Sequence, residues 1–234
     1  MKTCEEWSLE FDLLYNNITS DKAPGLDEYE KSVFLTRAQE AVVLGLYKGS
    51  FGDAFESTED LTAFLGELIR QANCSEVPSG SAAAAKKISS KSHVYALPSD
   101  LLFRTWEGCV ITVTGCGDTS VIVTPVTQDE FWRTSRDPFK GQNKNRVLRL
   151  AFDQYEYDST SASLEKFSEL VSDYPIVSYT VRYLSRPEPI ILSNLTSGLS
   201  INGEDEAKTC KLDEAVHQTI LAEAVRMAKA VWNT

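Results

Sequence analysis

The sequence contains little of what catalysis and metal binding require. It has only two histidines, and its five cysteines are scattered with no C-x-x-C pair, so a structural zinc site lacks its usual spacing. No serine lies in a nucleophile-elbow sequence, and no cysteine lies in a protease-type signature. These absences predict no catalytic residue, no metal ligand and no cofactor site. A cysteine–histidine pair formed only by the fold stays open as a less favoured alternative.

Long apolar runs and phosphate-binding loops are also missing. No apolar run approaches the roughly 18 residues that cross a bilayer. Glu5, Glu6 and Glu10 interrupt the stretch in which a signal peptide would be apolar. The glycines within 45–52 follow a predicted helix rather than opening one, so they do not form a phosphate cradle. An odd number of cysteines suits reduced thiols. We therefore expect a protein that is neither exported nor inserted in a membrane.

Positive charge is scarce. The chain has 23 Lys and Arg against 34 Asp and Glu, a formal net charge of −11. Such a surface repels phosphate backbones, which disfavours a nucleic-acid coat or a binder of anionic membranes. The 234 residues are 42% hydrophobic, which is enough for a proper core. Composition predicts an acidic, intracellular globular protein and leaves its function open.

Apolar residues recur at helical spacing through the first third of the chain. The stretch Trp7–Tyr15 predicts a short amphipathic helix. Asp27 and Glu30 have the spacing of a capping box, and the helix that they open is expected to end near Gly49. A third helix is predicted over 57–69.

The period becomes strand-like after residue 93. Val110–Thr114 and Ser120–Thr124 flank Gly115–Asp118, which is a strong hairpin signal. Further strands are predicted at 147–152, 176–184 and 190–192, and a short helix at 161–172.

Together these patterns predict an α+β fold with N-terminal helices, a central antiparallel sheet and a long C-terminal helix. The expected regions are a helical region (1–74), a linker-like loop (75–92), a mostly β region (93–210) and a C-terminal helix (211–234). The Ser, Ala and Lys content of the linker predicts a mobile loop in isolation. We expect the four regions to form one compact unit.

One cluster of cations stands out from the acidic background. It lies in a stretch whose Pro, Gly and Asn content predicts a loop, and its members are Arg133, Arg136, Lys140, Lys144, Arg146 and Arg149. Charge runs are usually solvated, so a plain surface loop that balances nearby carboxylates is one interpretation. The functional interpretation is a patch that docks on an acidic protein surface. DNA contact is the weakest of the three, because six cations on a chain of this net charge attract DNA only modestly.

Five segments that span nearly the whole chain carry a resemblance to a known family. They are Phe11–Glu40, Leu97–Phe103, Asp137–Leu150, Tyr179–Leu192 and Leu212–Trp232. In combination they resemble the neck ring, or head–tail connector, proteins of crAss-like and related tailed phages of Bacteroides-type hosts. No segment alone is a chemical motif, so the specificity lies in the combination.

The resemblance implies a structural virion protein that forms a ring below the portal. Such a ring, dodecameric by this resemblance, extends the DNA channel and connects head to tail. The implied partners are the portal, other neck or tail proteins and further copies of the chain. Packaged DNA passes through without specific binding, and no membrane is involved. The implied location is the virion neck, with the host cytoplasm during assembly. The family offers no catalytic residue to transfer.

Two other functions stay open. The protein can be an assembly adaptor or chaperone that is absent from the mature virion, or, less favoured, a soluble Cys-dependent hydrolase. Virion composition tests the first alternative, and thiol alkylation tests the second.

Overall fold

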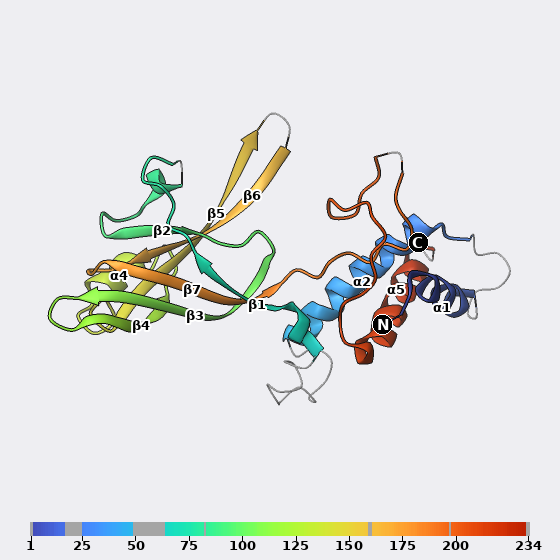
Figure 1. The fold of residues 1–234 in the computed structure, drawn as a ribbon, viewed down its shortest axis with the longest axis horizontal. Coiled ribbons are helices and arrows are strands. Elements are labelled where there is room, and N and C mark those ends of the chain that lie inside the picture. The colour runs from blue at the N-terminus through green and yellow to red at the C-terminus, as the bar shows by residue number, and fades with distance from the viewer. Residues whose placement is uncertain are drawn as a thin grey trace. The chain divides into compact units, whose positions relative to one another are not determined.

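The computed structural model describes residues 2–16, 25–48, 64–81, 83–158, 161–196 and 198–232 (Figure 1). The chain divides into two compact units, where the sequence predicts one. The helical unit consists of Met1–Ile69 together with Arg186–Thr234, and the β unit consists of Arg70–Ser185. The two termini of the chain therefore belong to the same unit.

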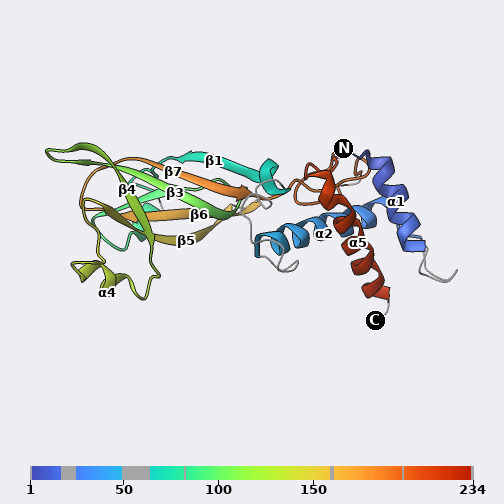
Figure 2. The ribbon, with the colours of Figure 1, turned by 90° about the horizontal axis from the view of Figure 1, so that it is seen from below.

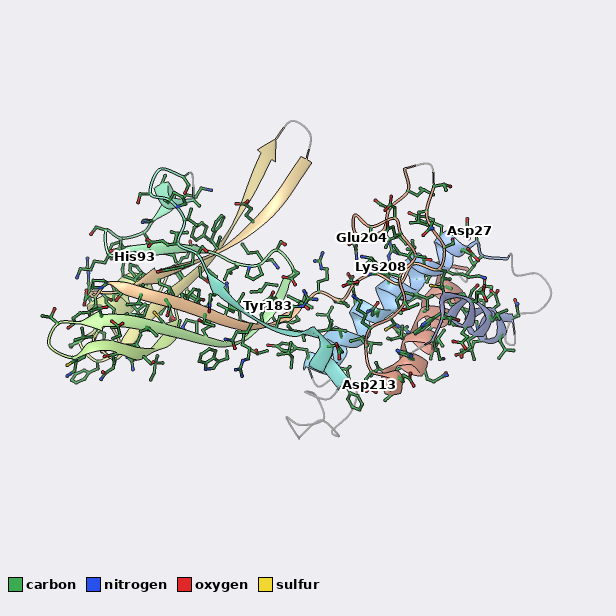
Figure 3. All side chains as sticks on the ribbon, in the orientation of Figure 1. Asp27, His93, Tyr183, Glu204, Lys208 and Asp213 are labelled. Carbon is green, nitrogen blue, oxygen red and sulfur yellow. The ribbon has the colours of Figure 1, made fainter. Side chains whose placement is uncertain are left out.

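Among its described residues, the helical unit has three α-helices, each of which corresponds to a helix that the sequence predicts. They are α1 (Cys4–Asn16), α2 (Glu28–Lys48) and α5 (Glu214–Trp232). Helix α1 buries Trp7, Phe11 and Tyr15, whose spacing of four residues places them on one face. The capping box is present, since the Glu30 N–H donates to the Asp27 carboxylate at 2.7 Å and the Asp27 N–H donates to the Glu30 carboxylate at 3.1 Å. Figure 3 labels Asp27 at the start of α2.

Two hydroxyls on α2 hold the returning chain. The Ser32 hydroxyl accepts a hydrogen bond from the Leu192 N–H at 3.0 Å, and the Thr36 hydroxyl accepts one from the Ile190 N–H at 3.1 Å. These bonds satisfy polar groups that are buried in the unit. The segment 190–192, predicted as a strand, therefore lies against α2 and forms only an isolated bridge between Ile191 and Lys208.

The β unit contains one seven-stranded sheet of order β1-β7-β3-β4-β5-β6-β2. The strands are β1 (Ile69–Cys74), β2 (Ser92–Ala96), β3 (Leu101–Val113), β4 (Gly117–Pro125), β5 (Arg146–Asp158), β6 (Ser161–Val171) and β7 (Ile176–Ser185). The pairs β3–β4, β3–β7, β5–β6 and β2–β6 are antiparallel, as expected, whereas β4 and β5 are parallel. The class is α+β.

The sheet curls, so that strands distant in its order meet. Tyr179 on β7 donates a hydrogen bond to Ser168 on β6, and its ring centroid lies 5.3 Å from that of Tyr95 on β2. Neither β6 nor β2 is a sheet neighbour of β7. The enclosed core contains Ile111, Val121 and residues from four other strands.

Two predicted helices differ from the structure. The predicted helix 161–172 is wrong, because residues 161–171 form β6, which pairs with β5 on one side and β2 on the other. Of the predicted helix 57–69, residues 57–63 lie outside the described residues, Gly66–Leu68 is a 3-10 helix and Ile69 begins β1. The region 75–92 includes a 3-10 helix, Ala84–Lys86.

The region 75–92 also packs on the sheet. Ala83 is buried with Val94 and Phe167 in a small cluster. The Ile88 N–H donates to the Glu169 carboxylate at 2.7 Å, which satisfies a buried charged group. These contacts hold Ala83 and Ile88 against β2 and β6.

Candidate docking surface

Most of the predicted basic stretch lies in the connection from β4 to β5. This connection and Arg146, the first residue of β5, are hereafter called the docking loop (residues 126–146). It contains the short helix α4 (Phe131–Arg136), which lies to one side of the strands in Figure 2. Phe131 is buried against Leu148, Leu150 and Val171. This apolar contact anchors one end of the loop to the sheet, and burial of a phenylalanine contributes about 2 kcal/mol.

The turn after α4 is held by hydrogen bonds from within the loop. The Asp137 carboxylate accepts hydrogen bonds from the N–H groups of Phe139 at 2.8 Å and Lys140 at 3.2 Å, and its carbonyl accepts one from the Gly141 N–H at 2.7 Å. The Arg146 guanidinium donates to the Phe139 carbonyl at 2.8 Å. The loop is therefore preorganised, which lowers the entropy cost of docking.

Four of the six predicted cations lie exposed on this loop. Arg133 has a side chain that is 81% exposed and pairs with Glu130 at 2.8 Å. The Arg136 guanidinium lies over the Trp132 ring, 5.8 Å from its centroid, and Lys140 and Lys144 are exposed. The structure thus places the four cations between 133 and 144 at the surface of one loop.

The other two cations have different surroundings. Arg146 is half-buried and holds the turn through the Phe139 carbonyl. Arg149 lies in β5, where its side chain is 13% exposed and its Nε lies 3.0 Å from the Glu107 carboxylate. A partner reaches Arg149 less readily than it reaches the exposed cations of the loop.

Two aromatic residues on the docking loop were missed by the sequence reasoning. Phe139 is 86% exposed and Trp132 is 53% exposed, beside the cations just described. Aromatic and arginine side chains together are typical of protein interface hot spots. Their position in a polar segment that contains Pro and Gly could have indicated that they are exposed, because a core residue is not expected there.

A hollow of about 680 Å³ lies between the end of β4 and the docking loop. Arg133, Lys140 and Arg146 line it together with the carboxylates of Glu130 and Asp137. This mixed polar lining is suited to charged side chains of a partner rather than to an apolar ligand.

Three of the five cysteines have the properties of packing residues. Burial raises the pKa of Cys74, Cys109 and Cys210 to about 11, so these thiols are protonated at neutral pH and are poor nucleophiles. Cys116 is an exposed residue of the β3–β4 turn. His93 pairs with Glu76 at 2.8 Å, and buried His217 has Nε2 3.0 Å from the Leu212 carbonyl. These surroundings give the hydrolase alternative little support.

Within the described ranges, no group of three or more His, Cys, Asp or Glu side chains is placed to hold a metal ion. Across the same residues, no helix is long and apolar enough to span a bilayer.

The described surface thus carries an exposed aromatic and cationic loop between β4 and β5. Comparison with known proteins specifies the class. The family model for phage tail ring protein 3/4 matches residues 1–234, and the chain belongs to that family. It is 37% identical to Ring protein 3 of Bacteroides phage crAss001, over 97% of this chain and 94% of that protein. It is 34% identical to Ring protein 4/5 of the same phage, over 97% of this chain and 92% of that protein.

These findings confirm the resemblance to crAss-like phage ring proteins. They support a structural ring protein of the phage particle.

Proposed function

We propose that this protein forms a ring below the portal in the virion neck, where it extends the DNA channel and connects head to tail. The family supports a ring of several copies, and the neck position and a dodecameric copy number belong to the proposal. A net charge of −11 suits a conduit that packaged DNA crosses without being held.

The observation that carries the proposal is the docking loop. The loop is preorganised and exposes four large side chains to solvent, those of Arg136, Phe139, Lys140 and Lys144. Exposed side chains of this kind add little to the stability of their own unit. Its chemistry fits an acidic protein surface with a small apolar recess: the cations steer the encounter, and the aromatic ring supplies buried contact area. The partners that we propose are proteins of the neck or tail, including the portal.

Particle composition and imaging test the position. We expect the protein in purified virions by mass spectrometry, and a reconstruction with a ring of copies around the tail axis. Absence from mature virions would support the alternative of an assembly adaptor or chaperone.

A charge-reversed variant tests the loop. Replacing Arg136, Lys140 and Lys144 by Glu leaves the fold intact, because exposed substitutions change stability by only about 0.5 kcal/mol each. Docking on the portal or an adjoining neck protein is expected to be lost, or to become strongly salt-sensitive, in co-sedimentation. Circular dichroism checks the fold. Normal docking of the folded variant at low and physiological salt would show that the loop does not dock on these partners.

A further inference from the structure

The charge of this chain is divided unequally between its two units. The helical unit contains 10 Lys and Arg against 21 Asp and Glu, and the β unit contains 13 of each. The difference of −11 in the helical unit equals the net charge of the whole chain, and the β unit is neutral. Within the neutral unit, the docking loop concentrates cations at one place.

Several cations of the docking loop are not neutralised by an ion pair. Arg133 is paired with Glu130, whereas Arg136, Lys140 and Lys144 are in no ion pair within the described residues. They are exposed beside Phe139 on a loop that is already held in shape. A surface of this kind gains most from a partner that is acidic.

The helical unit offers such a surface at the first turns of α1 and α2. Glu5 and Glu28 are exposed and form no ion pair with any described residue. The two helices contact each other just beyond these turns, because the Lys31 ammonium of α2 donates a hydrogen bond to the Ser8 hydroxyl of α1 at 3.2 Å. Lys31 and Ser8 lie three residues after Glu28 and Glu5, respectively. Glu6, also exposed, adds a third carboxylate to this acidic face.

We propose that the docking loop of one copy binds the acidic face of the helical unit, around Glu5 and Glu28, on a second copy of this chain. This proposal rests on the proposed function, since it names the partner of the docking loop in the ring. Each copy carries both surfaces, so the partner is present at matching stoichiometry. The two surfaces are different, so one copy can bind the next head to tail, and such a heterologous contact generates a ring where the rotation between copies closes.

Two charge-reversed variants test this contact. The first replaces Arg136, Lys140 and Lys144 by Glu, and the second replaces Glu5 and Glu28 by Lys. Wild-type protein is expected to self-associate at low salt in sedimentation velocity, and each variant alone is expected to associate at least about tenfold more weakly. An equimolar mixture regains association, because the reversed loop of one variant matches the reversed face of the other.

Matched controls change the same kinds of charge elsewhere. Replacing Lys86 and Lys87 by Glu, or Glu67 and Glu206 by Lys, is expected to leave self-association within about twofold of wild type. Circular dichroism confirms that each variant is folded. A mixture that does not associate, controls that weaken association equally, or a wild type that stays monomeric at low salt would each overturn the copy–copy contact.

Co-sedimentation with the portal separates this inference from the proposed function. If the first variant loses portal docking and keeps self-association, the loop docks on the portal, and only the copy–copy contact is wrong. If the protein is absent from purified virions, the proposed neck function fails, whatever the association measurements show.

Discussion

The Arg149 guanidinium lies with Nε 3.0 Å from the Glu107 carboxylate, so that β5 is joined to β3 inside the curled sheet. Both side chains are nearly buried, at 13% and 11% exposure. Glu107 also accepts a hydrogen bond from the Tyr179 hydroxyl of β7 at 2.6 Å. Burial, with the adjacent Glu107 charge, raises the pKa of Tyr179, so its hydroxyl stays a donor at neutral pH. One carboxylate thus connects three strands.

Removal of Arg149 is expected to destabilise the β unit. An Arg149→Met variant keeps most of the side-chain volume but leaves the Glu107 charge with weaker compensation, because the Arg104 Nε is 3.6 Å away. We expect a loss of about 2 to 4 kcal/mol in the free energy of unfolding, measured by urea denaturation. Arg133→Met is the control and should change it by less than about 0.5 kcal/mol. Equal effects for the two variants would contradict a structural role for the pair.

Local patterns predicted the elements that local chemistry determines. The hairpin at 110–124 forms with Cys109 opposite Val121 and Val113 opposite Gly117. Gly115 and Gly117 have φ angles of 86° and 73°, which an L side chain rarely adopts. The helices α1, α2 and α5 follow equally from apolar spacing and capping residues.

The features that the sequence does not predict depend on contacts between residues that are far apart in the chain. Residues 161–171 have apolar residues at spacings that suit a helix, but β2 and β5 supply hydrogen-bonding partners on both sides. Arg149 was grouped with the basic stretch by its proximity in sequence, whereas its ion-pair partner Glu107 is distant in the chain. The exposed Phe139 was missed because an apolar residue in a loop carries no periodic signal.

The close approach at Gly141 predicts a cost for any side chain there. A Cβ atom at this position would lie 2.9 Å from the backbone oxygens of both Asp137 and Ser135. Gly141→Ala must therefore displace the turn that presents Phe139 and Lys140. We expect docking on the portal or an adjoining neck protein, measured by co-sedimentation, to weaken about tenfold. The free energy of unfolding in urea is expected to fall by about 1 to 2 kcal/mol. Gly80→Ala, where no atom lies within 4 Å of the added Cβ, is the control. Unchanged docking by Gly141→Ala would show that the shape of the turn is unimportant.

Phe139 is expected to contribute to docking and not to folding. Its side chain is 86% exposed, so Phe139→Ala removes almost no intramolecular contact and should leave urea stability within about 0.5 kcal/mol. If the ring is buried by a partner, its loss weakens binding by about 2 kcal/mol, or roughly 30-fold. Leu199→Ala, an exposed apolar residue of the helical unit outside the acidic face, serves as the control in the same assay. Equal binding by Phe139→Ala and wild type would exclude the ring as an interface anchor.

The buried His217 predicts a pH dependence of stability. The centroid of its ring lies 5.1 Å from that of Trp7. Burial, together with the Lys2 charge, lowers the pKa of His217 below its ordinary value, and the opposing effects of the Leu212 carbonyl and Glu214 are smaller than that of burial. The unfolded chain therefore binds more protons than the folded chain below about pH 6.5. The contribution of His217 to stability is fully present above that pH and is lost as the pH falls toward the folded pKa.

The variant His217→Gln tests this pH dependence. It retains an N–H donor for the Leu212 carbonyl and does not titrate. Urea midpoints at about pH 7.5 and about pH 5.5 are expected to fall further for wild type than for this variant. Both proteins share the same carboxylates, so the difference between their falls in urea midpoint isolates the contribution of His217. An equal fall in the two proteins would show that His217 is not the titrating group.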